Sequence, residues 1–208
     1  MTRTVLILLI GVLSSIGTSS AQEPIRFQGR WFSGVCASQI HGDGVSGFNK
    51  FGLTAGPLLV LSSKDKIWEW GLLYTQKGSR KVPNPKAGDY STWRYRFTYV
   101  DVPLVRVWKP EPWWWFGLGV QPSLLLRAEE DFYSVGYSDL TTPSLRNVDV
   151  GLLAVLGLEY TDHLALEARL SQSALPISER PEAPVMRWDN FLMNMAIQAG
   201  VKILFGSN

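Results

Sequence analysis

Apolar and polar residues alternate with a period of two along most of the chain. In residues 68–75, tryptophan, leucine and tyrosine at the even positions alternate with glutamate, glycine, leucine and threonine at the odd positions. Successive side chains of a strand point to opposite faces, so this pattern predicts a sheet whose two faces meet different surroundings. Eight such strands are expected, at residues 30–41, 50–62, 66–77, 93–108, 113–128, 147–160, 164–172 and 191–205.

The connections between these strands alternate strictly in length. Residues 63–65, 109–112 and 161–163 are short, whereas 42–49, 78–92, 129–146 and 173–190 are long. Short turns on one side and long loops on the other are typical of outer-membrane barrels and not required of a soluble sandwich. In hydrocarbon every backbone N–H and C=O needs a partner, so such a sheet must close. The sequence therefore predicts an all-β fold, an eight-stranded antiparallel transmembrane β-barrel with short periplasmic turns and long extracellular loops.

The two ends of the chain indicate where the protein goes. Arg3, the short apolar run 5–13 and the small residues 19–21 have the pattern of a cleaved secretory signal peptide over residues 1–21. That leaves one barrel domain, residues 22–208, with no cysteine at its start for a lipid anchor. The last strand resembles the C-terminal strand by which barrels are recognised for insertion, with Gly200 and Phe205 at its key positions. The expected location is the bacterial outer membrane, with the barrel-assembly machinery as a partner during insertion.

Composition excludes several other classes of function. Twenty Lys and Arg against 18 Asp and Glu give no field suited to nucleic acid. The lone cysteine, Cys36, cannot form an internal disulfide and supplies no zinc or iron–sulfur centre. We therefore expect Cys36 to be a small packed residue of a strand, and we expect no metal, no cofactor and no nucleic-acid partner.

Charged residues fall on the face of the strands opposite the apolar one. They are Glu69, Asp101, Arg127, Asp149, Glu159, Glu167, Arg169 and Lys202. Buried charges persist when they are paired and hydrogen-bonded, and an eight-stranded barrel has an interior that side chains can fill. We interpret these residues as structural charges of a plugged lumen. A charged pore or proton path is the alternative, and a soluble lipid-binding barrel would need the reverse assignment of faces.

Pro103 requires a local explanation, since proline has no N–H for a sheet ladder. A closed barrel has no edge strand, so a β-bulge is expected near Asp101 and Pro103. Asp101 is then expected to point inward and to pair with an interior arginine.

Several segments resemble small outer-membrane proteins of the PorT type. The matching motifs lie at residues 38–40 with 42–44, 47–50, 52–56, 71–78, 99–104 (YVDVPL), 117–119 and 151–159. The resemblance covers nearly the whole chain after residue 21 and implies the same barrel fold. PorT is linked to type IX secretion, so the resemblance implies an accessory role beside an envelope or secretion complex, although most members have no assigned function.

An enzyme acting on outer-leaflet lipid is the main alternative, and it would need a histidine beside a serine nucleophile. Ser38 and His41 lie on one strand, but alternation places them on opposite faces. His163 falls in a periplasmic turn, and no metal-ligand spacing or phosphate loop is present. We expect no catalytic residues and no enzymatic activity.

Aromatic and charged segments suggest how the ends meet their surroundings. Residues 113–115, three consecutive tryptophans, are expected in a girdle at the periplasmic interface, with core packing or a sugar-stacking platform as alternatives. The second long loop is basic, with Lys77, Arg80, Lys81 and Lys86, and the third is acidic, with Glu129, Glu130, Asp131 and Asp139. These loops are solvated, or the basic one meets lipopolysaccharide phosphates or an acidic envelope protein. Outer-membrane lipid and lipopolysaccharide are the expected surroundings.

Overall fold

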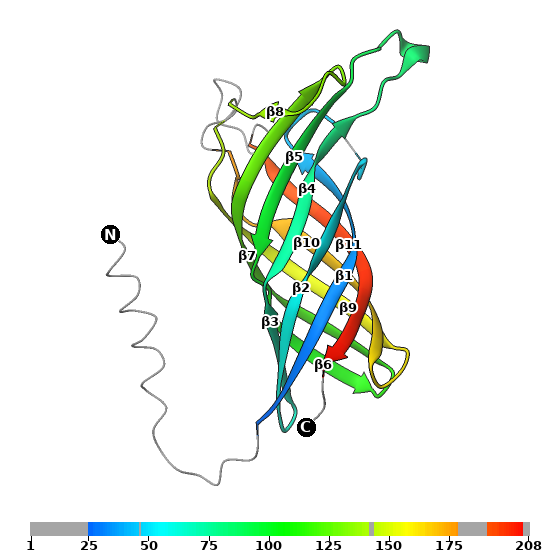
Figure 1. Cartoon of the computed structure of the whole chain (residues 1–208), viewed down its shortest axis with the longest axis vertical. Helices are drawn as coiled ribbons and strands as arrows, with labels where there is room; N and C mark the ends of the chain where they lie inside the picture. Colours follow the sequence, from blue (N-terminus) through cyan, green and yellow to red (C-terminus); the bar gives the residue numbers. More distant parts are fainter. Residues whose placement is uncertain (1–24, 46, 142–143, 179–190, 206–208) are drawn as a thin grey trace, which may run out of the picture.

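The sheet of the computed structural model closes on itself (Figure 1). The structure describes residues 25–45, 47–141, 144–178 and 191–205, so the expected signal peptide lies outside the described residues. Its strands are β1 Arg26–His41, β2 Lys50–Ser63, β3 Lys66–Gly71, β4 Leu73–Lys81, β5 Trp93–Asp101, β6 Leu104–Glu111, β7 Trp114–Phe132, β8 Ser138–Asp139, β9 Val148–Glu159, β10 Leu164–Ser173 and β11 Met193–Phe205. A 3₁₀ turn, η1, covers Pro85–Ala87. Among the described residues no helix is long and apolar enough to cross a membrane.

These segments form eight barrel strands in a meander. β3 and β4 both pair with β2, and they continue one another past Leu72, whose N–H donates to Pro57 O at 3.0 Å. β5 and β6 both pair with β7 and continue one another past Val102 and Pro103. β1 pairs with β2 on one side and with β11 on the other, which closes the ring. β8 is a two-residue strand that pairs with Glu129 and Glu130 of β7 and is not part of the ring. The expected barrel and its strand count are therefore present, with all pairs antiparallel.

The bulge expected at Pro103 lies elsewhere. Asp101 pairs with Ser123 and Leu104 with Val120, three residues further along each strand, so the register passes Pro103 unbroken. The N–H of Val102 donates to Pro122 O at 2.7 Å and keeps the ladder closed beside it. The strand thus loses one ladder bond at the proline and needs no extra residue.

The register shift occurs instead on β7. Thr98 pairs with Arg127 and the next residue, Tyr99, pairs with Leu125, which leaves Leu126 as the extra residue of a bulge. A single inserted residue moves all later side chains of that strand to the opposite face. β5 itself has no inserted residue, so Arg96 keeps the outward position that simple alternation gives it.

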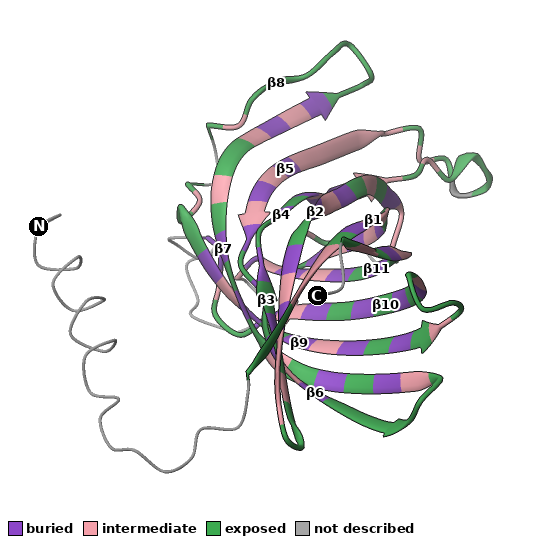
Figure 2. Ribbon diagram, turned by 60° about the horizontal axis from the view of Figure 1, so that its bottom comes forward, coloured by how far each residue is buried: buried purple, intermediate pink, exposed green. Residues whose placement is uncertain are grey.

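The faces follow the alternation of the sequence. Buried and exposed residues alternate along β9 and β10 (Figure 2). The exposed positions of the wall are largely apolar, as in Val35, Phe51, Leu53, Leu118, Leu152 and Leu156. An apolar exterior and a charged interior fit a barrel in lipid, and they are the reverse of a soluble lipid carrier.

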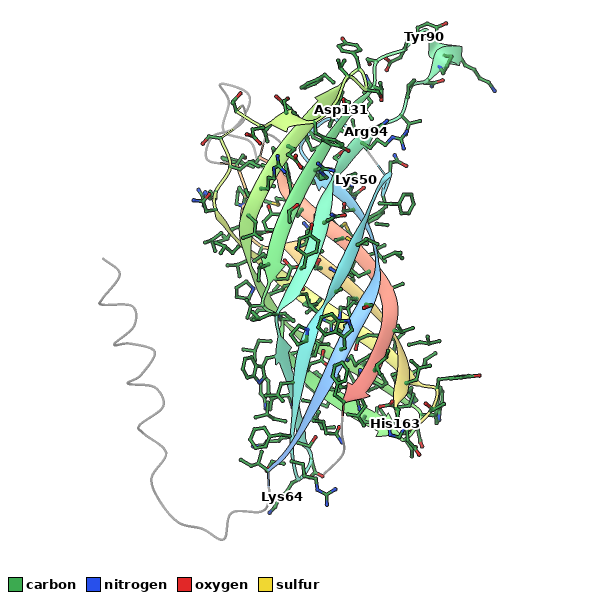
Figure 3. The ribbon with its side chains drawn as sticks, viewed as in Figure 1. Lys50, Lys64, Tyr90, Arg94, Asp131 and His163 are labelled. Carbon is green, nitrogen blue, oxygen red and sulfur yellow. The ribbon has the colours of Figure 1, made fainter. Side chains whose placement is uncertain are left out.

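The two ends of the barrel differ, as the connection lengths predicted. Lys64 and His163 mark the end with the short connections, here called the turn end, and Tyr90, Arg94 and Asp131 mark the opposite, loop end (Figure 3). The long connections at the loop end carry η1 and β8 (Figure 1). In outer-membrane barrels short turns face the periplasm, which is the side expected for the turn end.

The aromatic girdle of the turn end is only partly as expected. Trp68, Trp70 and Trp108 are exposed on the outer wall, and so is Trp113. Trp115, in contrast, points into the barrel and is only 4% exposed. Alternation along β7 requires this, and the indole lies against Gly157, where an added Cβ would stand 2.0 Å from Trp115 Cζ2. Core packing, the alternative for this residue, is therefore what the structure has.

Candidate functional site

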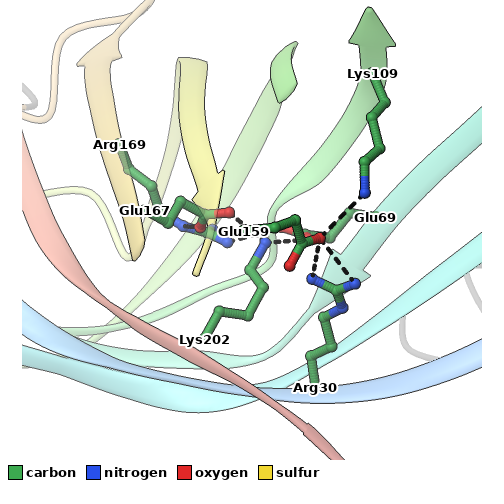
Figure 4. Close-up of polar contacts among 7 residues, drawn as sticks. All are labelled: Arg30, Glu69, Lys109, Glu159, Glu167, Arg169 and Lys202. Carbon is green, nitrogen blue, oxygen red and sulfur yellow. Dashed lines mark hydrogen bonds and ion pairs between the residues drawn. The ribbon is translucent and has the colours of Figure 1, made fainter. Parts of the chain in front are cut away.

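Four charged side chains meet across the lumen in the half of the barrel nearer the turn end. Glu69 comes from β3, Glu167 and Arg169 from β10, and Lys202 from β11 (Figure 4). Each carboxylate contacts both cations, and all four side chains are buried. We call this set the lumen quartet.

The hydrogen bonds of the quartet form a closed circuit. Arg169 donates from Nη2 to Glu69 Oε1 at 2.8 Å and from Nε to Glu167 Oε1 at 2.6 Å. Lys202 donates from Nζ to Glu69 Oε2 at 2.6 Å and also to Glu167 Oε2. Two negative and two positive charges cancel, so the quartet has no net charge despite its burial.

Aromatic rings cover the two cations. The Arg169 guanidinium lies 4.8 Å from the ring centre of Phe32, and Lys202 Nζ lies 5.2 Å from that of Trp115. A cation over an aromatic face gains electrostatic stabilisation, most of all when it is shielded from water. The quartet is thus fixed by hydrogen bonds within and by rings from the walls.

A second ion pair lies further toward the loop end. Lys77 Nζ donates to Asp101 Oδ1 at 3.0 Å, with both side chains almost fully buried. The Lys77 ammonium also lies 4.9 Å from the ring centre of Tyr99. Asp101 therefore points inward as expected, but its partner is a lysine and not an arginine.

Asp149 is held by neutral groups. Its Oδ2 accepts from Ser173 Oγ at 2.8 Å and from Asn194 Nδ2 at 3.1 Å. The same amide nitrogen donates to the Tyr99 hydroxyl at 3.1 Å, which links this carboxylate to the Lys77 layer.

The loop end of the lumen is filled by apolar side chains. They are Ile40, Phe97, Tyr99, Ile177 and Leu192, with Tyr95, Leu125, Ala128, Leu140 and Leu145 packed against them. The buried members come from β1, β5 and the segments beside β10 and β11, so they close this end from several sides.

The turn end of the lumen is open and charged. Glu159 Oε1 accepts from Arg30 Nη1 and Nη2 and from Lys109 Nζ, each at 3.4 Å (Figure 4). All three side chains are partly exposed at the mouth.

The predicted lumen residues fall into three groups. Those buried inside the barrel are Glu69, Asp101, Asp149, Glu167, Arg169 and Lys202. Glu159 lies at the mouth. Arg127 is a correction: its side chain is 63% exposed, and it pairs outside the lumen with Glu129 at 3.1 Å. The extra residue Leu126 reverses the face of β7 just before it.

Sequence reasoning missed several lumen residues that alternation could have found. Lys77 ends the predicted strand 66–77 but was counted with the basic loop that follows, yet it is in phase with Glu69 and is buried on β4. Lys109 was assigned to a turn, yet it is in phase with Asp101 and lies on β6. Arg30 begins the first predicted strand and was not singled out. Continuing the period of two by a few residues reaches all three.

The catalytic candidates do not come together. Ser38 is buried and donates to Gly78 O at 3.0 Å, whereas His41 is exposed at the end of the same strand. His163 lies at the opposite, turn end (Figure 3). The described residues contain no group of three or more His, Cys, Asp or Glu that could hold a metal ion. Cys36 is buried inside the barrel, as a packed strand residue would be.

The insertion-signal residues have clear structural positions. Gly200 pairs with Gly34 of β1 and Glu167 of β10, and a Cβ there would stand 2.3 Å from Ser33 O. Phe205 is exposed at the turn end, with its ring centre 6.5 Å from that of Trp31 in an edge arrangement.

Two carboxylates in the loops have perturbed titration. Hydrogen bonds from Ser91 Oγ and N, together with Lys81 at 2.9 Å, hold the pKa of Asp89 well below its ordinary value. Burial raises the pKa of Asp43, against the opposing hydrogen bond from Val45 N at 2.8 Å.

Acidic residues at the loop end pair with arginines of β5 and β7. Arg96 Nε donates to Glu129 Oε2 at 2.7 Å, while Arg127 binds both Glu129 and Asp139. Arg80 and Arg94 are directly opposite one another on β4 and β5. Within the described ranges no carboxylate lies at ion-pair distance from either of these two arginines.

Comparison with known proteins agrees with the fold. The family model "Outer membrane protein beta-barrel domain" matches residues 17–176. Neisserial surface protein A is similar in structure, with a TM-score of 0.50 at 15% identity over 88% of this chain and all of the other. Two structures of Ail, the attachment invasion locus protein of Yersinia pestis, each have a TM-score of 0.47 and cover 86% of this chain. The structure with the heparin analogue sucrose octasulfate is 12% identical and is matched over 99% of its length. The other is 14% identical and is matched over 98% of its length.

No curated protein shows significant similarity to the chain. The family match over residues 17–176 covers most of the chain's length, and the closed sheet of the structure is a barrel, as the name of the family states. The chain therefore belongs to the outer membrane protein beta-barrel domain family and is a protein of the bacterial outer membrane.

Proposed function

We propose that this protein is a non-conducting, non-enzymatic barrel that serves as a structural or accessory element of the outer membrane. The observation that carries the proposal is the lumen quartet, in which each of two carboxylates binds each of two cations across the interior. A solute would have to break this circuit to pass it.

The apolar cluster at the loop end supports the same proposal. Ile40, Phe97 and Ile177 are completely buried there. Ions crossing this layer would lose their hydration without gaining a polar partner, which is costly. Two barriers of different chemistry in series, one ionic and one apolar, favour a filled lumen over the alternative of a pore.

Conductance in planar bilayers tests the proposal directly. The purified barrel should give no stable, defined channel in 1 M salt, where an open path would carry the largest current. The double variant Glu69→Ala/Arg169→Ala removes two bulky members while keeping the lumen neutral, and it should also stay closed because the apolar cluster remains. A reproducible open channel in the unmodified protein would refute the proposal.

An accessory place beside an envelope or secretion complex is the finer form of this proposal. It is supported by the resemblance of residues 99–104 and 71–78 to PorT-type barrels and by the separation of Ser38 from His41, which weighs against lipid chemistry. Purification of the tagged protein under mild detergent should recover an envelope protein in fixed ratio. Recovery of the barrel alone, at native expression and after crosslinking, would reject the accessory role and leave a free-standing structural barrel.

Contact with lipopolysaccharide phosphates is favoured by one specific observation. Arg80 and Arg94 stand directly opposite on neighbouring strands at the loop end, and like charges in that position repel unless an anion lies between them. Arg80→Gln/Arg94→Gln should therefore lower the lipopolysaccharide that copurifies, whereas Lys86→Gln at the exposed η1 turn should not. Equal amounts with both variants would exclude this contact.

A further inference from the structure

A cavity occupies the space between the lumen quartet and the turn end. Its volume is about 220 Å³, and its walls include Arg30, Lys109, Glu159, Trp115, Ile67 and Val107. A wider hollow of about 410 Å³ lies outside it toward the short turns, and the two share Gln28, Arg30, Lys109 and Glu159. The bridge from Arg30 and Lys109 to Glu159 thus stands between an inner chamber and the open mouth. We call the two hollows together the vestibule.

Charge around the inner chamber is unbalanced. Outside the quartet its described lining has one carboxylate, Glu159, and two cations, Arg30 and Lys109, and all three hydrogen bonds to Glu159 Oε1 measure 3.4 Å. Charge-assisted hydrogen bonds of this kind are ordinarily about 2.7–2.9 Å, so the bridge is loose. Arg30 Nε is buried with no partner among the described residues. Because the quartet below is neutral, the lining of the inner chamber retains one excess positive charge; Asp162 lines the outer hollow only.

The inner chamber combines this charge with an apolar surface. Trp115, Ile67 and Val107 line it, and Trp115 belongs to the same buried cluster as Val107. The floor is Glu69 and Lys202, both already satisfied within the quartet. A ligand in this chamber would meet cations at the entrance and an indole and aliphatic side chains on the walls. Its floor would be paired charges with no net charge.

We propose that the vestibule binds a small organic carboxylate with a compact apolar body, which enters from the periplasm. The carboxylate would replace Glu159 between Arg30 and Lys109, since a guanidinium presents paired donors that match a carboxylate and an ammonium adds a point charge. The apolar body would lie against Trp115 and Val107. This inference is independent of the proposed function, because a ligand held above the quartet requires no passage through the barrel.

Size limits the ligand class. The inner chamber measures about 220 Å³, which suits a ligand with a small body. An aromatic acid or a short-chain fatty acid fits, whereas a long acyl chain or a lipid does not. Ligand pockets for larger molecules begin at about 300 Å³.

The experiment uses 4-fluorobenzoate as the probe and ¹⁹F NMR as the readout. The full mature barrel in lipid nanodiscs should bind the probe saturably, and empty nanodiscs should not. 4-Fluorobenzyl alcohol, which keeps the body without the charge, should bind at least about tenfold more weakly, as expected when a charge-assisted hydrogen bond is lost.

Variants locate the site. Arg30→Gln and Lys109→Met should each weaken binding by about tenfold, again the value of one charge-assisted hydrogen bond. Lys86→Met, which removes an exposed cation at the far end of the molecule, is the matched control and should leave binding unchanged. Ser62→Phe fills the inner chamber from a partly exposed position of β2, so it should abolish probe binding while the barrel still shows folded gel mobility.

Three results would overturn the proposal: no saturable binding, equal binding of the alcohol, or equal effects of Lys86→Met and Lys109→Met. Folded gel mobility is required of every variant, so a loss of binding cannot be mistaken for misfolding. Conductance is recorded on the same preparations. An open channel with normal probe binding rejects only the proposed function, and a closed barrel without binding rejects only the vestibule site.

Discussion

Removing one carboxylate of the lumen quartet should destabilise the barrel far more than removing a carboxylate on its surface. In Glu167→Leu, Arg169 loses its 2.6 Å hydrogen bond from Nε and Lys202 loses one of its two carboxylate contacts. The quartet then carries one uncompensated positive charge in a fully buried place. At about 4 Å and an effective dielectric constant of 20, each lost pair is worth about 4 kcal/mol of attraction, while the desolvation of both cations remains. Breaking a buried pair in this way typically costs about 3–5 kcal/mol, which is the expected decrease in the free energy of unfolding.

Urea unfolding in lipid vesicles, followed by tryptophan fluorescence and gel mobility, measures this decrease. The control is Asp139→Ala, because Asp139 is 81% exposed and lies 3.8 Å from Arg127. Substitutions of this exposed kind usually change stability by less than about 0.5 kcal/mol. The double variant Glu167→Leu/Lys202→Met restores neutrality with apolar groups and should recover much of the loss, giving a coupling energy within the range of about 0.5–3 kcal/mol seen for residues in contact.

The reasoning fails if Glu167→Leu falls within 0.5 kcal/mol of the unmodified protein, about the effect of an exposed substitution. That result would mean that water reaches Arg169 and Lys202 and replaces the lost contacts, so the lumen would be a hydrated path. A double variant as unstable as the sum of its single variants would likewise show that Glu167 and Lys202 do not act on one another.

Three further expectations concern other parts of the barrel. Gly157→Val should push the Trp115 indole out of place and cost about 1–3 kcal/mol in urea unfolding, as overpacked cores do, whereas Gly29→Ala, whose added Cβ approaches only a carbonyl at 4.0 Å, should cost little. The pKa of Asp89 is lowered in the folded hairpin, so the ionised carboxylate stabilises the hairpin tip fully above the ordinary pKa of about 3.9. That stabilisation is lost as pH falls toward the lower pKa of the folded state. Amide exchange at the tip should show this pH dependence, and Asp89→Asn should abolish the pH dependence. Phe205→Asp should lower the folded yield in the outer membrane, and normal gel mobility and yield would remove Phe205 from the insertion signal.

Periodicity was enough to predict the barrel, because both of its faces are specified by the same alternation. A residue such as Glu69 must point inward once Trp68 and Trp70 point to lipid, and the register then brings it near residues distant in sequence. The pairing itself is not predictable in this way. Arg169 is 100 residues from Glu69, and their contact depends on the barrel's tilt and stagger, which no local pattern specifies.

Local insertions limited the rest of the prediction. Leu126 is one apolar residue among several, and nothing in the sequence distinguishes it from a regular strand position, so Arg127 was assigned to the wrong face. Pro103 gave the opposite error, because a missing N–H suggests a bulge although a strand can lose one ladder bond without changing register. Segment ends caused the third error: Lys109 was left in a connection, and Lys77 was counted with the loop after its strand, because β4 and β6 extend further than their hydrophobic patterns.

The difference between the two ends of the lumen constrains what the protein can do. At the loop end Ile40, Phe97 and Ile177 are completely buried, so a solute arriving from outside meets packed hydrocarbon. At the turn end Arg30 and Glu159 are partly exposed and a cavity of about 220 Å³ lies behind them. We therefore expect any molecule that exchanges with the lumen to do so through the turn end. Contacts with the cell's surroundings depend instead on the loop-end segments, whose arginines and carboxylates lie outside the barrel interior. The two surfaces are separated by the quartet and can be tested by separate variants, because among the described residues no loop-end side chain forms a hydrogen bond or ion pair with it.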